Sequence, residues 1–162
     1  MQSASMLVAL CTGHPTVRAY GFPAEWRLRV RSIRLVLVDD NPEVLETLID
    51  LLQPTYDIAG TFSDGMSVLQ QVSALGPDLV ILDISLGDMT GFEVARRLRK
   101  SGCPAKIIFL TVHENIDFVR AAFDLDASGY VFKSRISSDL IDAINRACEG
   151  GQFSSAELPL AQ

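Results

Sequence analysis

Acidic, hydroxyl and amine side chains stand directly after short aliphatic runs in this chain. Asp39 and Asp40 follow the run LVLV, and Asp83 follows LVIL. Further along, Thr111 follows IIFL and Lys133 follows GYVF. Short aliphatic runs of this kind predict buried strands, so all five polar side chains are expected at strand ends.

Three carboxylates that meet at one edge of a sheet repel one another. A proton, a cation or a nearby ammonium group would relieve the repulsion. A hard divalent ion fits best, because Mg²⁺ takes oxygen ligands and is held by one or two carboxylates together with phosphate oxygens; Mn²⁺ is the other candidate. Lys133 would then supply a point charge to an anionic ligand, and Thr111 would donate its hydroxyl. Because a carboxylate can attack phosphorus, the set predicts a phosphoryl site.

Taken singly, each of these residues has an ordinary structural explanation. Asp39 or Asp40 could help to cap a helix. Thr111 could hydrogen-bond to a loop backbone, and Lys133 could be solvated. The prediction therefore depends on their coincidence at successive strand ends.

Strands and amphipathic helices alternate from Ile33 onward. Strands are expected at Ile33–Val38, Tyr56–Thr61, Asp78–Asp83, Lys106–Thr111 and Gly129–Lys133. Helices are expected from Pro42, after the cap Asn41, and at Asp64–Leu75, Gly91–Lys100, Glu114–Leu125 and Ser137–Glu149. Such alternation implies an α/β fold with a doubly wound, five-stranded parallel sheet, since right-handed crossovers place helices on its faces. Ligands then bind beyond the carboxyl ends of the strands.

Composition narrows the class of protein. At 162 residues, 48% of them hydrophobic, the chain has room for one domain with its own core. Its 20 acids and 14 bases give a net charge of −6, which disfavours nucleic-acid binding. The three cysteines lie far apart, which suits reduced thiols and a cytoplasmic location. The aliphatic runs are too short to span a membrane.

Four segments closely resemble the receiver domains of two-component response regulators. They are LVLVDDNP at 35–42, LVILDISLGDMTG at 79–91, IIFLTVHE at 107–114 and ASGYVFKS at 127–134. The resemblance implies a flavodoxin-like (βα)5 receiver fold with strand order 2-1-3-4-5. ASGYVFKS and the later GGQFSS look most like receivers of the NarL/FixJ type, which are attached to helix-turn-helix outputs.

The resemblance also implies a role for each residue of the site. Asp83 would be the phosphorylated residue. Asp39 and Asp40 would bind Mg²⁺ or Mn²⁺ together with Asp83, and the carbonyl of Ser85 would complete the coordination.

Two further residues would contact the phosphoryl group, and one would respond to it. Thr111 and Lys133 match the residues that contact the phosphoryl oxygens. Tyr130, three residues before Lys133, matches the switch aromatic whose rotamer follows the movement of the threonine loop. Phosphorylation would shift an existing equilibrium between inactive and active states.

The implied partners are a sensor histidine kinase or phosphotransfer protein and a downstream effector protein. The chain itself would bind neither nucleic acid nor membrane, and the sequence leaves open whether activation produces a homodimer. The domain would be a phosphoacceptor switch that catalyses only its own phosphorylation and dephosphorylation, not an enzyme acting on other substrates.

Three parts are expected along the chain. Residues 1–31 carry four arginines and no sustained apolar period, so we expect an N-terminal extension that is disordered. Residues 32–153 would form the receiver domain and 154–162 a C-terminal tail. No pattern of an output domain follows, which favours a stand-alone receiver over a truncated DNA-binding transcriptional regulator.

Departures from the family pattern keep other interpretations open. Gly87 stands where the family usually has proline, and Val112 where it has a small residue, so a degenerate receiver that acts only as a phosphorylation-independent interaction module remains an alternative. A phosphatase would need an acid at Ser85, and a flavin module would need a phosphate-binding loop after the first strand. We expect His113 to be exposed, with contact to a hydrolytic water as the alternative.

Overall fold

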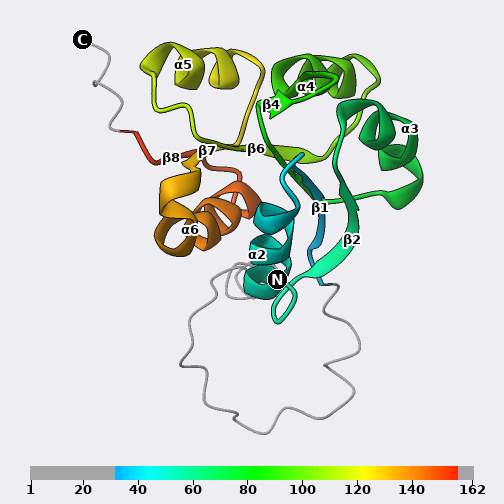
Figure 1. Ribbon diagram of the computed structural model, residues 1–162, viewed down its shortest axis with the longest axis horizontal. Helices are drawn as coiled ribbons and strands as arrows, with labels where there is room; N and C mark the ends of the chain where they lie inside the picture. The colour runs from blue at the N-terminus through cyan, green and yellow to red at the C-terminus, as the bar shows by residue number, and fades with distance from the viewer. Residues whose placement is uncertain (1–31, 157–162) are drawn as a thin grey trace, which may run out of the picture.

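The computed structural model describes residues 32–156 as a sheet with helices on both faces (Figure 1). The strands of the main sheet are β1 Arg34–Val38, β2 Asp57–Phe62, β3 Leu79–Leu82, β6 Lys106–Thr111, β7 Gly129–Phe132 and β8 Phe153–Ser154. The helices are α2 Pro42–Leu52, α3 Gly65–Leu75, α4 Gly91–Lys100, α5 Ile116–Asp124 and α6 Ile136–Cys148, with a short 3₁₀ turn at Lys133–Arg135. The predicted extension at 1–31 and most of the predicted tail lie outside the described residues.

The sheet has the order β2-β1-β3-β6-β7-β8, and its neighbouring strands are all parallel. In chain order the first five strands are therefore arranged 2-1-3-4-5, which confirms the predicted α/β fold and its topology. The order in which strands are added to the sheet reverses between β1 and β3, where Val38 is in register with Leu82. The residues that follow these two strands must therefore come close together, at the place where such folds bind ligands.

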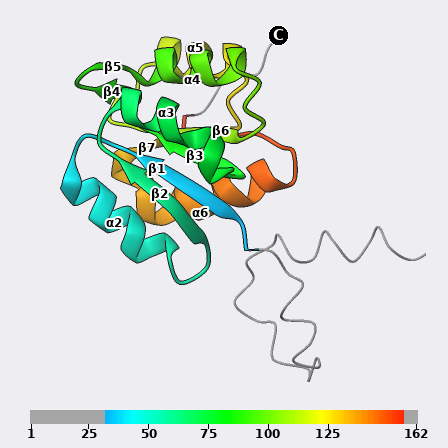
Figure 2. The same cartoon turned by 90° about the vertical axis from the view of Figure 1, so that its right-hand side faces the viewer.

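Two hydrophobic cores lie on the two faces of the sheet. Helices α3, α4 and α5 cover one face, and α2 and α6 cover the other (Figures 1 and 2). The side chains of β1 alternate between them, since Val36 and Val38 join the first core and Leu35 and Leu37 the second. This two-sided burial explains why the central strands are aliphatic throughout. Among the helices of residues 32–156, none is long and apolar enough to cross a membrane.

Helices α2 to α5 each begin after a side-chain cap, whereas α6 has none. The predicted cap Asn41 is confirmed, because its side chain accepts a hydrogen bond from the backbone N–H of Glu43. In α5 the helix begins at Ile116, two residues later than expected, because Asn115 caps it by accepting from the N–H of Asp117. The cap at Asn115 thus sets the start of α5 two residues after the predicted start.

The sixth strand, β8, was not indicated by the sequence. Its backbone pairs with β7 through Phe153 N–H to Ser128 O (3.1 Å) and Ser155 N–H to Tyr130 O (2.9 Å). The buried Ser155 hydroxyl also accepts from the N–H of Phe132. Two residues are too few to produce a periodic pattern, so the pairing rests on contacts between distant parts of the chain. The strand spans the predicted end of the domain at 153.

A small antiparallel hairpin connects β3 to α4. It consists of β4 Ser85–Leu86 and β5 Met89–Thr90. At its end, Gly91 donates its N–H to Ile84 O at 2.7 Å, and a Cβ added to Gly91 would overlap the backbone oxygen of Asp83. Helix α4 therefore begins directly against the backbone of Asp83, and only glycine fits there.

We predict that Gly91→Ala lowers the free energy of unfolding by about 2–3 kcal/mol, because the backbone around Asp83 must move to admit the methyl group. Gly87→Ala is the matched control: an added Cβ there meets nothing within 4 Å, and its effect should stay within about 0.5 kcal/mol. Urea denaturation of the two variants measures both. Equal stabilities would contradict the close approach.

Candidate functional site

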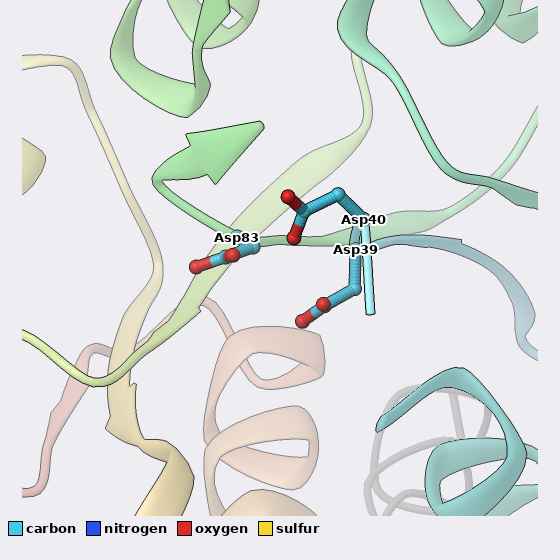
Figure 3. A group of neighbouring side chains, drawn as sticks. All are labelled: Asp39, Asp40 and Asp83. Carbon is cyan, nitrogen blue, oxygen red and sulfur yellow. The ribbon is translucent and has the colours of Figure 1, made fainter. Parts of the chain in front are cut away.

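The three predicted carboxylates meet at the carboxyl ends of β1 and β3. Asp39 and Asp40 directly follow β1, and Asp83 directly follows β3. One ligand oxygen from each lies within 4.8 Å of the others, and Figure 3 shows the three side chains grouped together. Asp39 and Asp83 are buried, whereas Asp40 is exposed. The cluster therefore has a covered side and a side open to solvent.

Lys133, at the end of β7, reaches into this cluster. Its Nζ lies 2.6 Å from Oδ2 of Asp39 and 3.2 Å from Oδ2 of Asp83. Both contacts are ion pairs, and the contact with Asp83 is also a hydrogen bond. Oδ1 of Asp39 accepts from the N–H of Asn41. One ammonium group thus bridges two buried carboxylates.

Burial and charge act against each other on these groups. Burial raises the pKa of Asp83 above its ordinary value, the Lys133 charge opposes this rise, and the Asp39 charge adds to it. Burial alone would lower the pKa of Lys133, but its contacts with Asp39 and Asp83 outweigh burial and raise that pKa. Lys133 therefore stays charged, while burial makes the ionised form of Asp83 energetically unfavourable.

The group of oxygens suits a divalent cation. Three carboxylates face the single charge of Lys133, so negative charge remains in excess. Oδ2 of Asp39 is buried and is paired with the ammonium group of Lys133. Carboxylate oxygens without nitrogen or sulfur ligands are the donor set that Mg²⁺ and Mn²⁺ prefer. The residues present thus fit the predicted ion, and Asp40 and Asp83 could bind it from the open side.

Thr111 and Ser85 both follow the three acids along the chain. Thr111 is the last residue of β6, the strand that pairs with β3, and it is fully buried. Its hydroxyl accepts from the N–H of His113 at 3.3 Å. Ser85 is the exposed first residue of β4, two residues after Asp83. Their proposed roles toward a phosphoryl group and a metal remain predictions.

Tyr130 lies inside the domain. Its ring is buried, packs edge-on against Phe132, and its hydroxyl donates to the backbone oxygen of His113 at 2.8 Å. Burial first, and the Asp83 charge second, raise the pKa of the phenol, so it stays protonated. The hydrogen bond joins β7, the strand that precedes Lys133, to the loop that follows Thr111. This is a suitable place for a residue that responds to changes in that loop.

Two residues near the site were missed or misjudged from the sequence. His113 was expected to be exposed but is partly buried: its ring stacks on Phe118 with centroids 4.6 Å apart, and its Nε2 lies 3.0 Å from Oγ of Ser85. Asp88, in the hairpin turn, accepts from backbone N–H groups of α3. Neither contact has a sequence signal, because both join segments more than 20 residues apart.

Comparison with known proteins identifies the family. A family model described as the response regulator receiver domain matches residues 35–145, well over half of the chain. The chain belongs to the response regulator receiver family. The resemblance seen in the four sequence motifs is thereby confirmed, and the receiver is a signalling domain of two-component systems.

Curated relatives of this receiver are named as regulatory proteins. The positive alginate biosynthesis regulatory protein of Pseudomonas aeruginosa is 33% identical over 129 residues, which cover 78% of this chain and 51% of that protein. The nitrate/nitrite response regulator protein NarP of Escherichia coli is 30% identical over 124 residues, which cover 75% of this chain and 58% of that protein. The chain thus spans between half and two thirds of the length of these relatives.

Solved structures support the same assignment. A LuxR-family two-component response regulator from Aurantimonas sp. SI85-9A1 has a TM-score of 0.71 and 31% identity, covering 76% of this chain and 89% of that one. A LuxR-family DNA-binding response regulator from Staphylococcus aureus has a TM-score of 0.66 and 26% identity, covering 70% and 96%. The expected likeness to receivers of the NarL/FixJ type is therefore confirmed.

The electrostatics of the site predict that Asp83→Asn stabilises the metal-free receiver by about 1 kcal/mol at neutral pH. The pKa of Asp83 is raised in the folded state, so its charge opposes folding above that pKa. The penalty disappears as pH falls through the raised pKa toward the ordinary value of 3.8. Denaturation with a chelator present, at a series of pH values, measures this difference.

Asp142→Asn is the control for this comparison, because it makes the same charge change at an exposed position in α6. Its stability difference from the wild type should be small and should not follow the Asp83 titration. A destabilised Asp83→Asn variant would contradict the excess of negative charge.

Proposed function

We propose that Asp83 accepts a phosphoryl group in a Mg²⁺-dependent reaction, and that the resulting acyl phosphate switches the binding of a partner. The observation that supports this most directly is the acid cluster itself. Three carboxylates meet at the ligand-binding edge of the sheet, and one ammonium group contacts two of them. The receiver family supplies the biological context.

The phosphoryl donor is proposed to be a sensor histidine kinase or a phosphotransfer protein. A carboxylate oxygen of Asp83 attacks the phosphorus of a phosphohistidine, the P–O bond forms, the P–N bond breaks, and the imidazole leaves with the electron pair. Oδ1 of Asp83 accepts from the N–H of Ile84 at 2.7 Å and Oδ2 contacts Lys133, so the side chain is oriented before the donor arrives. Orientation of this kind lowers the entropic cost of the transfer.

Lys133 and Thr111 stabilise the charge of the transferred group. Once Asp83 carries the phosphoryl group as an acyl phosphate, the negative charge lies on the phosphoryl oxygens, and the ammonium group of Lys133 can follow it because it is a mobile point charge. The hydroxyl of Thr111 can donate to another oxygen after its loop moves inward. A bound Mg²⁺ or Mn²⁺ ion, held by Asp39, Asp40, Asp83 and the Ser85 carbonyl, would neutralise the remaining charge.

The switch is proposed to pass through Tyr130. Its hydroxyl is fixed to the backbone oxygen of His113, two residues after Thr111. If Thr111 moves toward the phosphoryl group, that hydrogen bond must change, and the aromatic ring can take a new rotamer. Two states that differ in this region would bind a partner differently, which is sufficient for a population shift.

The wider context is proposed from the family. Downstream, an effector protein would read the switched face, and a homodimer is one form that this output could take. The domain acts as a switch and would catalyse only its own phosphorylation and dephosphorylation. A cytoplasmic location agrees with the kinase partner. A similar protein is named as a transcriptional regulatory protein, and another as a DNA-binding response regulator. We propose such an output only for a longer protein that contains this receiver.

A phosphorylation-independent interaction module is the second candidate, on the basis of Gly87 and the two-thirds exposed Val112. The hairpin that contains Gly87 is ordered, and the acid cluster and Lys133 are in place. These observations favour the phosphoacceptor.

Incubation with a small phosphodonor such as acetyl phosphate tests the proposal. We expect the wild-type chain to gain the mass of one phosphoryl group when Mg²⁺ is present, and none when a chelator replaces it. Asp83→Asn should gain none, because the amide nitrogen is not a nucleophile. Intact-mass spectrometry measures all three samples.

Asp142→Asn, which changes an exposed acid on α6, is the control and should be labelled like the wild type. Labelling of Asp83→Asn to the wild-type level would remove Asp83 from its role. A folded wild type that is never labelled, by acetyl phosphate or by phosphoramidate, would favour the interaction module.

A further inference from the structure

The hairpin after Asp83 lacks a rigid turn. Its two strands are joined by Gly87 and Asp88, and Gly87 has free space around it, since an added Cβ would meet nothing within 4 Å. Glycine leaves more backbone freedom than any other residue. The turn residues therefore cannot by themselves fix the position of β4 and β5.

Asp88 ties this turn to another helix. Its Oδ1 accepts from the backbone N–H of Gly65 at 2.9 Å, and its Oδ2 accepts from the N–H of Met66 at 3.0 Å. Both N–H groups belong to the first turn of α3, where no intrahelical acceptor is available. The N–H of Gly65 is the main cause of a lowered pKa at Asp88, so the carboxylate remains charged. The side chain therefore caps a helix from 22 and 23 residues away.

Helix α3 already has a local cap. Asp64 accepts from the N–H of Ser67 at 2.7 Å and from its hydroxyl at 2.8 Å. The two carboxylates thus divide the free N–H groups of one helix end between them. Asp64 is the residue directly before α3, whereas Asp88 belongs to the hairpin. Only the Asp88 contact therefore connects α3 to the segment after Asp83.

Packing confirms that the hairpin and α3 are in close contact. Gly65 is buried, and a Cβ added to it would lie 2.6 Å from Cγ of Met89 and 2.7 Å from Cγ2 of Val94. The first turn of α3 therefore lies directly on β5 and α4. A polar contact at Asp88 and an apolar contact at Met89 fix the same side of the hairpin.

We infer that Asp88 is a positioning residue: its contact with α3 holds the β4–β5 hairpin, and with it the Ser85 carbonyl, in place beside Asp83. The inference rests on the proposed function in one respect, because it assigns that carbonyl to the metal. Asp88 itself touches neither the acid cluster nor a phosphoryl group. It supplies the restraint that a proline at position 87 would otherwise give the loop.

The consequence is a specific link between α3 and metal binding. Ser85 follows Ile84, whose N–H donates to Asp83 and whose oxygen accepts from Gly91. The near end of the hairpin is therefore anchored by backbone contacts, and its far end by Asp88. Loss of the far anchor should loosen the hairpin without displacing Asp83.

The experiment compares Asp88→Ala with Asp64→Ala. Each removes one capping carboxylate from the start of α3, so the loss of helix capping is matched, but only the first frees the hairpin. Asp88→Asn is the conservative variant, because its amide oxygen can still accept one of the two hydrogen bonds. Two quantities are measured: amide hydrogen exchange over residues 84–90 in metal-free protein, and the Mg²⁺ dissociation constant by calorimetry.

We expect hydrogen exchange in the hairpin to become faster in Asp88→Ala and to remain as in the wild type in Asp64→Ala. The Mg²⁺ dissociation constant should rise about ten-fold in Asp88→Ala and change by less than about two-fold in Asp64→Ala. Asp88→Asn should fall between the wild type and Asp88→Ala in both measurements.

Unchanged exchange in Asp88→Ala would overturn the anchoring role, whatever the metal does. Faster exchange with wild-type Mg²⁺ affinity would overturn the link to the metal site. Equal losses of affinity in Asp88→Ala and Asp64→Ala would assign the effect to helix stability and also overturn it. A wild type that binds no Mg²⁺ would remove the proposed function and the metal part of the inference, and the exchange comparison would still decide whether Asp88 holds the hairpin.

Discussion

The site depends on two buried carboxylates held together by one ammonium group. Lys133 contacts both Asp39 and Asp83, which come from different strands and would repel each other without it. A third carboxylate, Asp40, lies at the exposed side of the same cluster. Removing charged groups from water is costly, and a single lysine does not neutralise three acids. The fold therefore contains an excess of negative charge, which a bound divalent cation can balance.

The surrounding structure positions this cluster from several directions. The parallel register of β1 and β3 brings the acids together, and Gly91 allows α4 to begin against the backbone of Asp83. Asp88 joins the hairpin to α3 on one side. On the other side, β8 pairs with β7, the strand that carries Tyr130 and directly precedes Lys133. Most of these contacts join segments that are far apart in the sequence. The order of the site therefore depends on the folding of the whole sheet.

Much of this arrangement could be predicted from the sequence. The aliphatic runs and their polar ends predicted the strands and the meeting of Asp39, Asp40 and Asp83, because burial on both faces produces a strong local pattern. The order of the strands was implied by the family resemblance. The hairpin, β8 and the contacts of Asp88 could not be predicted. Two-residue strands leave no periodicity, and a helix cap supplied from 23 residues away looks like any exposed acid in a turn. His113 was misjudged because its polar partner Ser85 lies in β4, 28 residues away, and because its stacking on Phe118 requires α5 to fold back over the loop.

The central claim is that Lys133 and a divalent cation neutralise the same carboxylates. Calorimetric titration with Mg²⁺ of the wild type and of Lys133→Met tests it most directly, with thermal melts confirming that both are folded. Because removal of the ammonium group leaves more negative charge for the ion, Lys133→Met should bind Mg²⁺ more tightly, by about ten-fold. Equal affinity, or weaker binding by the folded variant, would contradict the account.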